Sequence, residues 1–318
     1  MGGKMERSGQ GHSRGQRLVL CLAAAALLWV AVMVACGQSD QQAVVDSAEP
    51  RTDSVVSADG VMIHYTAAGP GDSALVFVHG WSCDRTYFQD QLEAFDDLYR
   101  VVAVDLAGHG QSGTNRTDWT IEAFGADVVA VMNELDIEPV ILVGHSMGGA
   151  VVVEAARQAP GRVEALIGID TYQDLTQTWD DDQARQFVAP FTQDFPAATR
   201  LFVQQMFRGN ADTALVHRVS EDMASAPKDV AIASFKALAA YDPAAALAEM
   251  RKPIRSINAD MYPTNIEANQ QAAASYEVTF MPGQGHFPHL EAPETFNRIL
   301  RETISEFWPI DSAVADGP

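Results

Sequence analysis

Short continuous apolar runs alternate with stretches of helical spacing between residues 54 and 170. Two alternating runs at 54–69 flank Asp59-Gly60, which is typical of a β-hairpin. The next apolar runs have the character of buried parallel strands, and they lie at 74–80, 100–110 (with the following loop), 139–144 and 163–169. The segments between them have helical spacing, namely Phe88 to Phe95, 121–135 and 148–159. This pattern predicts an α/β domain with a mostly parallel central sheet flanked by helices.

The alternation pauses after Asp170. Residues 171–250 contain no apolar strand run, and aromatic residues recur there at roughly helical intervals: Trp179, Phe187, Phe191, Phe195, Phe202 and Phe207. Strand patterns return at 254–259 and 276–281, with helices expected near 265–274 and 293–307. Thr264 and Glu267 fit a capping box for the first of these two helices. We therefore expect one domain over 54–318 with a helical cap inserted at about 171–250.

The first 36 residues differ from the rest of the chain. Four basic residues precede an apolar stretch from Leu18 to Ala35, and small residues surround Cys36. This arrangement is typical of an export signal, and Met33-Val34-Ala35-Cys36 resembles a bacterial lipobox, in which the cysteine is lipidated. We expect a signal segment at 1–35, a flexible tether at 36–53 and a lipoprotein held in the cell envelope by lipid on Cys36. An uncleaved transmembrane anchor and ordinary secretion are the alternatives, and all three export the domain.

Composition narrows the possible partners. The chain has 318 residues, a formal net charge of −21 and 47% hydrophobic residues. The negative charge argues against nucleic acid and anionic membrane surfaces as electrostatic partners. Cleavage of the signal removes Cys21, and lipid would occupy Cys36, so Cys83 alone would remain free. The sequence thus predicts no disulfide framework and no metal cluster.

Gly144-His145-Ser146-Met147-Gly148 fits the pattern G-x-S-x-G. An apolar strand precedes it and an Ala/Val-rich helix follows, so the serine is expected on a tight strand-to-helix turn where only small residues fit two positions away. This predicts Ser146 as a nucleophile, and the alternative is a glycine-rich turn with a buried serine.

With these motifs the chain resembles the α/β-hydrolase superfamily over residues 54–308. His79-Gly80-Trp81 looks like the oxyanion loop of that family, and residues 105–112 and 283–300 resemble its G-x-G-x-S turn and its terminal histidine loop and helix. The resemblance implies that the backbone N–H groups of Trp81 and Met147 stabilise an oxyanion. It also implies His286 as the general base, with His289 as the competitor, and no cofactor.

The third member of the triad is less clear from the sequence. The family usually places its acid nine residues after the proline that opens the preceding strand, and from Pro253 this position holds Tyr262. Asp260 lies two residues earlier, whereas Asp170 ends the strand at 163–169, where some family members carry the acid. We favour Asp170 over Asp260, with Asp174 as a weaker third candidate and capping of the next segment as the alternative role of Asp170.

A serine nucleophile favours acyl transfer to water, so we expect a serine hydrolase acting on a small-molecule ester or similar acyl substrate. The aromatic residues of the cap are expected to form an apolar acyl pocket that favours short to medium acyl chains. A cofactor-free haloperoxidase or C–C bond hydrolase, and a non-catalytic binding protein on the same fold, are the alternatives.

Overall fold

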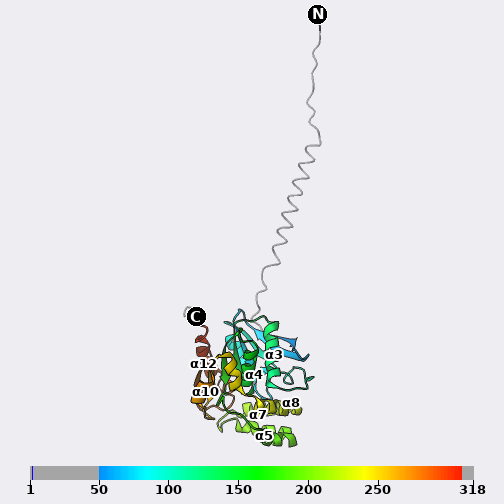
Figure 1. The fold of residues 1–318 in the computed structure, drawn as a ribbon, viewed down its shortest axis with the longest axis vertical. Helices are drawn as coiled ribbons and strands as arrows, with labels where there is room; N and C mark the ends of the chain where they lie inside the picture. The colour runs from blue at the N-terminus through cyan, green and yellow to red at the C-terminus, as the bar shows by residue number, and fades with distance from the viewer. Residues whose placement is uncertain (1, 3–49, 310–318) are drawn as a thin grey trace. The chain divides into compact units, whose positions relative to one another are not determined.

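A single eight-stranded sheet organises the domain. The computed structural model describes residue 2 and residues 50–309, and the sheet runs in the order β1-β2-β4-β3-β5-β6-β7-β8 (Figure 1). The strands are β1 Arg51–Val56, β2 Met62–Ala68, β3 Ala74–Val78, β4 Arg100–Val104, β5 Val140–His145, β6 Val163–Ile169, β7 Pro253–Ala259 and β8 Ser275–Met281. The two β2 pairings are antiparallel and the other strand pairs are parallel. The predicted mostly parallel sheet is therefore confirmed.

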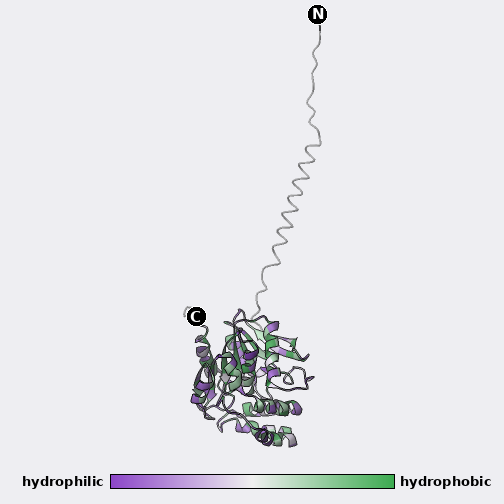
Figure 2. Cartoon of the chain, in the orientation of Figure 1, coloured by the Kyte–Doolittle hydropathy of each residue, from purple (hydrophilic) through white to green (hydrophobic). Residues whose placement is uncertain are grey.

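Helices cover both faces of the sheet, and its central strands are therefore buried on both sides. Every residue of β3 and β5 is buried. Alternate residues of a strand point to opposite faces, so Val76 packs toward α3 (Ile121–Glu134) and α4 (Met147–Gln158), and Phe77 packs toward α2 (Gln89–Phe95) and α12 (Pro293–Ser305). In Figure 2 the helices carry both hydrophilic and hydrophobic residues, as expected for elements with one packed face.

The segment between β6 and β7 is helical. It contains α5 Asp181–Gln193, α6 Phe195–Gln205, α7 Thr213–Ser225, α8 Lys228–Ala240 and α9 Pro243–Met250. Figure 1 shows α5, α7 and α8 gathered at one end of the described domain. Within residues 50–309, no single helix has the length and hydropathy of a membrane span, and only α8 and α9 together reach that threshold, as a pair bent by 62°.

Two local expectations need correction. β1 begins at Arg51, so residues 51–53, which were assigned to the tether, are part of the sheet. Helix α10 (Ile266–Ala272) is capped by Asn265, whose side chain accepts a hydrogen bond from the N–H of Ala268, instead of by the expected box of Thr264 and Glu267. The expected signal segment, Cys36 and most of the tether lie outside the described residues.

Candidate active site

Ser146 lies on the turn between β5 and α4. Its backbone has φ 52° and ψ −118°, a conformation that non-glycine residues rarely adopt and that costs on the order of 1–3 kcal/mol. The flanking glycines make the turn possible because a Cβ on Gly144 would lie 2.4 Å from the carbonyl oxygen of Gly148, and a Cβ on Gly148 would lie 2.2 Å from that of Val78. The G-x-S-x-G spacing thus has a steric cause in this fold.

Gly148→Ala is expected to lower the free energy of unfolding by roughly 2–3 kcal/mol, because the added methyl group must displace backbone of β3. Urea denaturation measures the change. Gly161→Ala is the matched control, since a Cβ there meets nothing within 4 Å, and we expect a change within about 0.5 kcal/mol. Equal denaturation midpoints for the two variants would contradict the steric explanation of the turn.

His286 lies in the loop after β8, and three hydrogen bonds position it. Its Nδ1 lies 2.6 Å from Oδ2 of Asp170. Its backbone N–H donates to the carbonyl of Met206 in the cap at 2.7 Å, and its carbonyl lies 2.9 Å from Nε2 of the buried His145. Ring and main chain are therefore both anchored, with the Nδ1 side of the imidazole toward the carboxylate.

Asp170 is held as firmly as the histidine. It directly follows β6 at φ 43°, its side chain is fully buried, and its backbone N–H donates to the carbonyl of Ile257 of β7 at 3.0 Å. Oδ1 accepts the N–H of Ala259 at 2.9 Å, which leaves Oδ2 for His286. A buried carboxylate with a partner on each oxygen is well oriented to hold an imidazole in one tautomer.

The other two candidate acids have different partners. Asp260 is exposed, and its Oδ1 accepts from Nη2 of Arg208 at 2.6 Å and from the N–H of Gly283 at 3.0 Å. The Gly283 hydrogen bond is the main cause that lowers its pKa. Asp174 accepts from Thr176 and from the side-chain amide of Asn265. Neither carboxylate has a hydrogen bond to His286 among the contacts of the described residues.

The expected oxyanion donors lie next to Ser146. Gly80 approaches Ser146 so closely that a Cβ on Gly80 would lie 3.2 Å from Cβ of the serine, and Trp81 follows it. Met147 begins α4, and the first N–H groups of a helix have no partner within that helix. The indole N–H of Trp81 donates to the carbonyl of Ala231 at 2.6 Å, which fixes this loop against the cap.

The remaining motif histidines are buried. His289 is fully buried and stacks on Phe88, and its burial lowers its pKa to about 3. Burial likewise lowers the pKa of His79 to about 4 and that of His109 to about 3. Within residues 50–309, no group of three or more His, Cys, Asp and Glu side chains is arranged to hold a metal ion. His286 differs from His79, His109 and His289 because it lines a cavity.

That cavity has a volume of about 550 Å³ and is bordered by both Ser146 and His286. Of the six aromatic residues expected to form its wall, Trp179, Phe187 and Phe202 do so. Phe191 and Phe195 pack edge-on against Trp81 instead, and Phe207 stacks on Phe287. Further wall residues that the sequence did not indicate include Phe235, Leu238, Met206, Met223 and Phe287.

Two residues that support the backbone of the site were not predicted from the sequence. Thr171 donates its hydroxyl to the carbonyl of Ser146 at 3.1 Å, and the Glu291 carboxylate accepts the N–H groups of Gly285 and Phe287 on either side of His286. Glu291 lies in the quoted histidine-loop motif, but no spacing rule indicates that its side chain folds back onto the loop. Both residues stabilise backbone next to the candidate catalytic groups.

Comparison with known proteins places this geometry in a family. Residues 75–299 match the Alpha/beta hydrolase family. The chain is 27% identical over 264 residues to 3-oxoadipate enol-lactonase 2 of Acinetobacter baylyi, covering 79% of this chain and 96% of that protein. It is 38% identical over 116 residues to a non-heme chloroperoxidase of Streptomyces lividans, which covers 36% of this chain and 42% of the relative. The chain spans 42% and 28% of the lengths of two further curated relatives.

Solved structures agree on the fold. A thermophilic esterase from Thermogutta terrifontis superimposes with a TM-score of 0.71 at 22% identity, over 81% of this chain and 99% of the esterase. The family match covers well over half of the chain, and its residues include Ser146, the three candidate acids and His286. This chain therefore belongs to the alpha/beta hydrolase family.

Proposed function

We propose that this chain is an exported, lipid-anchored serine hydrolase that cleaves an ester or similar acyl bond. The observation that carries the reaction is the hydrogen bond between His286 Nδ1 and Asp170 Oδ2 at a cavity that Ser146 also borders. A histidine oriented by a carboxylate beside a serine on a strained turn is the arrangement that activates a hydroxyl for acyl transfer.

In the proposed reaction, Nε2 of His286 takes the Ser146 hydroxyl proton as Oγ bonds to the acyl carbon. The N–H groups of Trp81 and Met147 stabilise the charge on the carbonyl oxygen. The carbon–oxygen bond to the leaving group then breaks, and Nε2 returns its proton to the leaving oxygen. Water repeats these steps on the acyl-enzyme, releasing the acid and restoring Ser146. Asp170 stays ionised and stabilises the imidazolium.

The relatives support this class of reaction without naming the substrate. One is a lactonase by name, and one structural neighbour is an esterase. Screening p-nitrophenyl esters from acetyl to palmitoyl with the full-length chain, together with labelling of Ser146 by a fluorophosphonate, tests the proposal. Absence of both labelling and hydrolysis would favour a non-catalytic binding protein.

Similarity to the chloroperoxidase favours a second candidate, a cofactor-free haloperoxidase. Both activities would use the same nucleophile, so labelling alone does not separate them. Bromination of a phenol with hydrogen peroxide and bromide, compared with the rate found for the best ester, separates them. Bromination faster than ester hydrolysis would make peroxide chemistry the main activity.

Lipid anchoring yields its own prediction. Cys36→Ser in the full-length chain should abolish incorporation of radiolabelled palmitate in a bacterial host and shift the protein from the membrane to the soluble fraction. Cys83→Ser is the matched control and should keep the label, since Cys83 is buried. A wild-type chain that takes up no labelled lipid would exclude the lipoprotein and leave the uncleaved anchor or secretion.

A further inference from the structure

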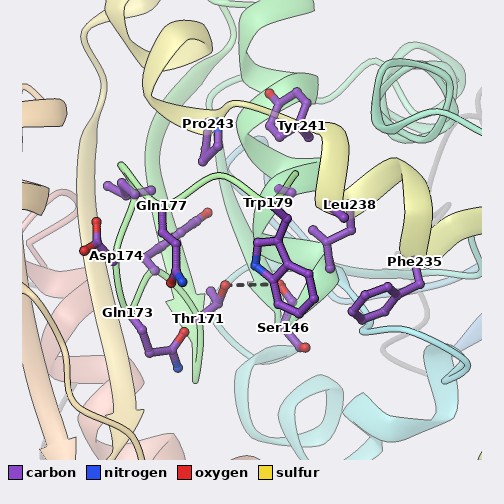
Figure 3. A pocket seen from close by; sticks show the side chains of 14 residues that line it. Ser146, Thr171, Gln173, Asp174, Gln177, Trp179, Phe235, Leu238, Tyr241 and Pro243 are labelled. Carbon is purple, nitrogen blue, oxygen red and sulfur yellow. Dashed lines mark hydrogen bonds between the residues drawn. The ribbon is translucent and has the colours of Figure 1, made fainter. Parts of the chain in front are cut away.

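A second cavity meets Ser146 from another side. It has a volume of about 230 Å³, and Figure 3 shows Trp179 between its polar side chains, among them Gln173 and Gln177, and its apolar side chains Phe235 and Leu238. These five side chains and Ser146 line the larger cavity as well. The serine therefore lies at the junction of two cavities, with Trp179 in the wall that both share.

The larger cavity is lined mainly by apolar side chains, and seven of them are Phe, Trp or Tyr. Phe187 stacks on Phe235 with ring centroids 4.0 Å apart, and Phe202 and Trp81 pack edge-on beside them. Such walls bind flat apolar groups through burial of area and through ring contacts. Cys83, which is buried and whose thiol pKa is raised by that burial, adds no charge to this wall.

Half of the residues that line the smaller cavity alone are polar, and the other half are apolar, namely Ala150, Leu175, Ala239 and Pro243. Thr171, Tyr172, Asp174 and Tyr241 border it, and the Thr176 hydroxyl lowers the pKa of Asp174, which favours the carboxylate. Among residues 50–309, those lining the two cavities include no arginine or lysine. Neither cavity thus offers a cationic partner to an anionic substrate, and the strongly negative chain disfavours anions further.

The position of His286 indicates which side of the ester bond each cavity holds. His286 borders the larger cavity and not the smaller one. As general acid it must reach the oxygen of the leaving group, so that group has to occupy the cavity that His286 borders. The acyl side of the bond then faces the smaller cavity, in contrast to the expectation that the aromatic cap residues enclose the acyl chain.

Building on the proposed hydrolase function, we propose that the substrate is an ester without negative charge that places an apolar, preferably aromatic, alcohol in the larger cavity and a short acyl group in the smaller cavity, with Trp179 separating the two subsites. Trp179 is 36% exposed, so the residue is accessible to substrate and its truncation removes little of the domain core.

An isomeric pair of esters tests this orientation. Benzyl acetate and methyl phenylacetate have the same composition and carry the ring on opposite sides of the ester. We expect kcat/KM for benzyl acetate to exceed that for methyl phenylacetate by about tenfold or more, the usual effect of matching an apolar group to an apolar pocket. Equal values, or a preference for methyl phenylacetate, would overturn the orientation.

Two variants locate the subsites. Phe202→Ala changes only the larger cavity and should lower kcat/KM for benzyl acetate at least about fivefold more than for its isomer. Trp179→Ala should bring the isomer ratio toward one, because the ring of methyl phenylacetate could then reach the aromatic wall. An unchanged ratio in Trp179→Ala would overturn the separating role, and Phe187→Ala replaces Phe202→Ala if that variant fails to fold by circular dichroism.

Fluorophosphonate labelling separates a wrong orientation of the substrate from the absence of hydrolase activity. Loss of both fluorophosphonate labelling and hydrolysis of every ester would remove the hydrolase itself. Intact labelling with hydrolysis of other esters but neither isomer would overturn the substrate class alone. Labelling with the expected isomer ratio supports both.

Discussion

Ser146→Ala is expected to lower kcat for ester hydrolysis on the order of 10⁶-fold, to the residual rate that the oxyanion donors and substrate binding supply. The change removes one oxygen from a turn whose shape depends on Gly144, Gly148 and the hydrogen bond from Ser146 N–H to Ile169 at 3.1 Å. Because none of these features requires the hydroxyl, the variant should fold and bind substrate as the wild type does. Burst kinetics with a p-nitrophenyl ester measure the loss, since no acyl-enzyme can form.

The matched control for that variant is Ser225→Ala. Ser225 ends α7, where its hydroxyl only bonds the carbonyl of Asp222 within the same helix, so kcat should change less than about twofold. A Ser146→Ala variant with near-normal turnover would end the acyl-enzyme mechanism and point to a reaction that bypasses the serine.

Asp170→Asn should lower kcat by about 10³–10⁴, with the larger figure equal to the loss seen for the same change in serine proteases. The structure supplies the reason. The N–H of Ala259 requires an acceptor, so the carboxamide introduced by the substitution would turn its oxygen there and its NH2 group toward His286. That NH2 can only donate to Nδ1, which places the ring proton on Nε2 and removes the base that Ser146 needs.

Asp260→Asn provides the matched comparison. The chemical change is the same, but it alters only an exposed ion pair with Arg208 that water and salt screen, so kcat should fall less than about tenfold. Steady-state kinetics, with circular dichroism to verify folding, rank the two variants. The reverse ranking would make Asp260 the acid, and equal small losses would mean that His286 works without either carboxylate.

The order of strands and helices was predictable because it depends on local periodicity. The continuous apolar runs at 139–144 and 163–169 match β5 and β6, since central parallel strands are buried on both faces. The turn at Ser146 was predictable in part for a similar reason, because a Cβ on Gly144 would meet the carbonyl of Gly148 four residues later, whereas Gly148 is required by the close approach of Val78 on the distant strand β3. Helix caps were less secure, as Asn265 shows, since neighbouring polar residues can each accept the same N–H group.

The partners of His286 required the tertiary structure. Asp170 lies 116 residues before it in the chain. Sequence spacing left Asp260, which is far nearer, as the alternative acid, but its carboxylate accepts hydrogen bonds from Arg208 and Gly283 instead. The sequence likewise identified aromatic residues in the cap without determining which of them face the serine. Trp179 and Phe202 line the cavity while Phe191 and Phe195 pack behind Trp81. The sequence determined the fold class, the turn at Ser146 and the set of candidate residues because these follow largely from local pattern. The pairing of side chains across strands and the orientation of the cap helices follow from packing between distant segments, which only the tertiary structure decides.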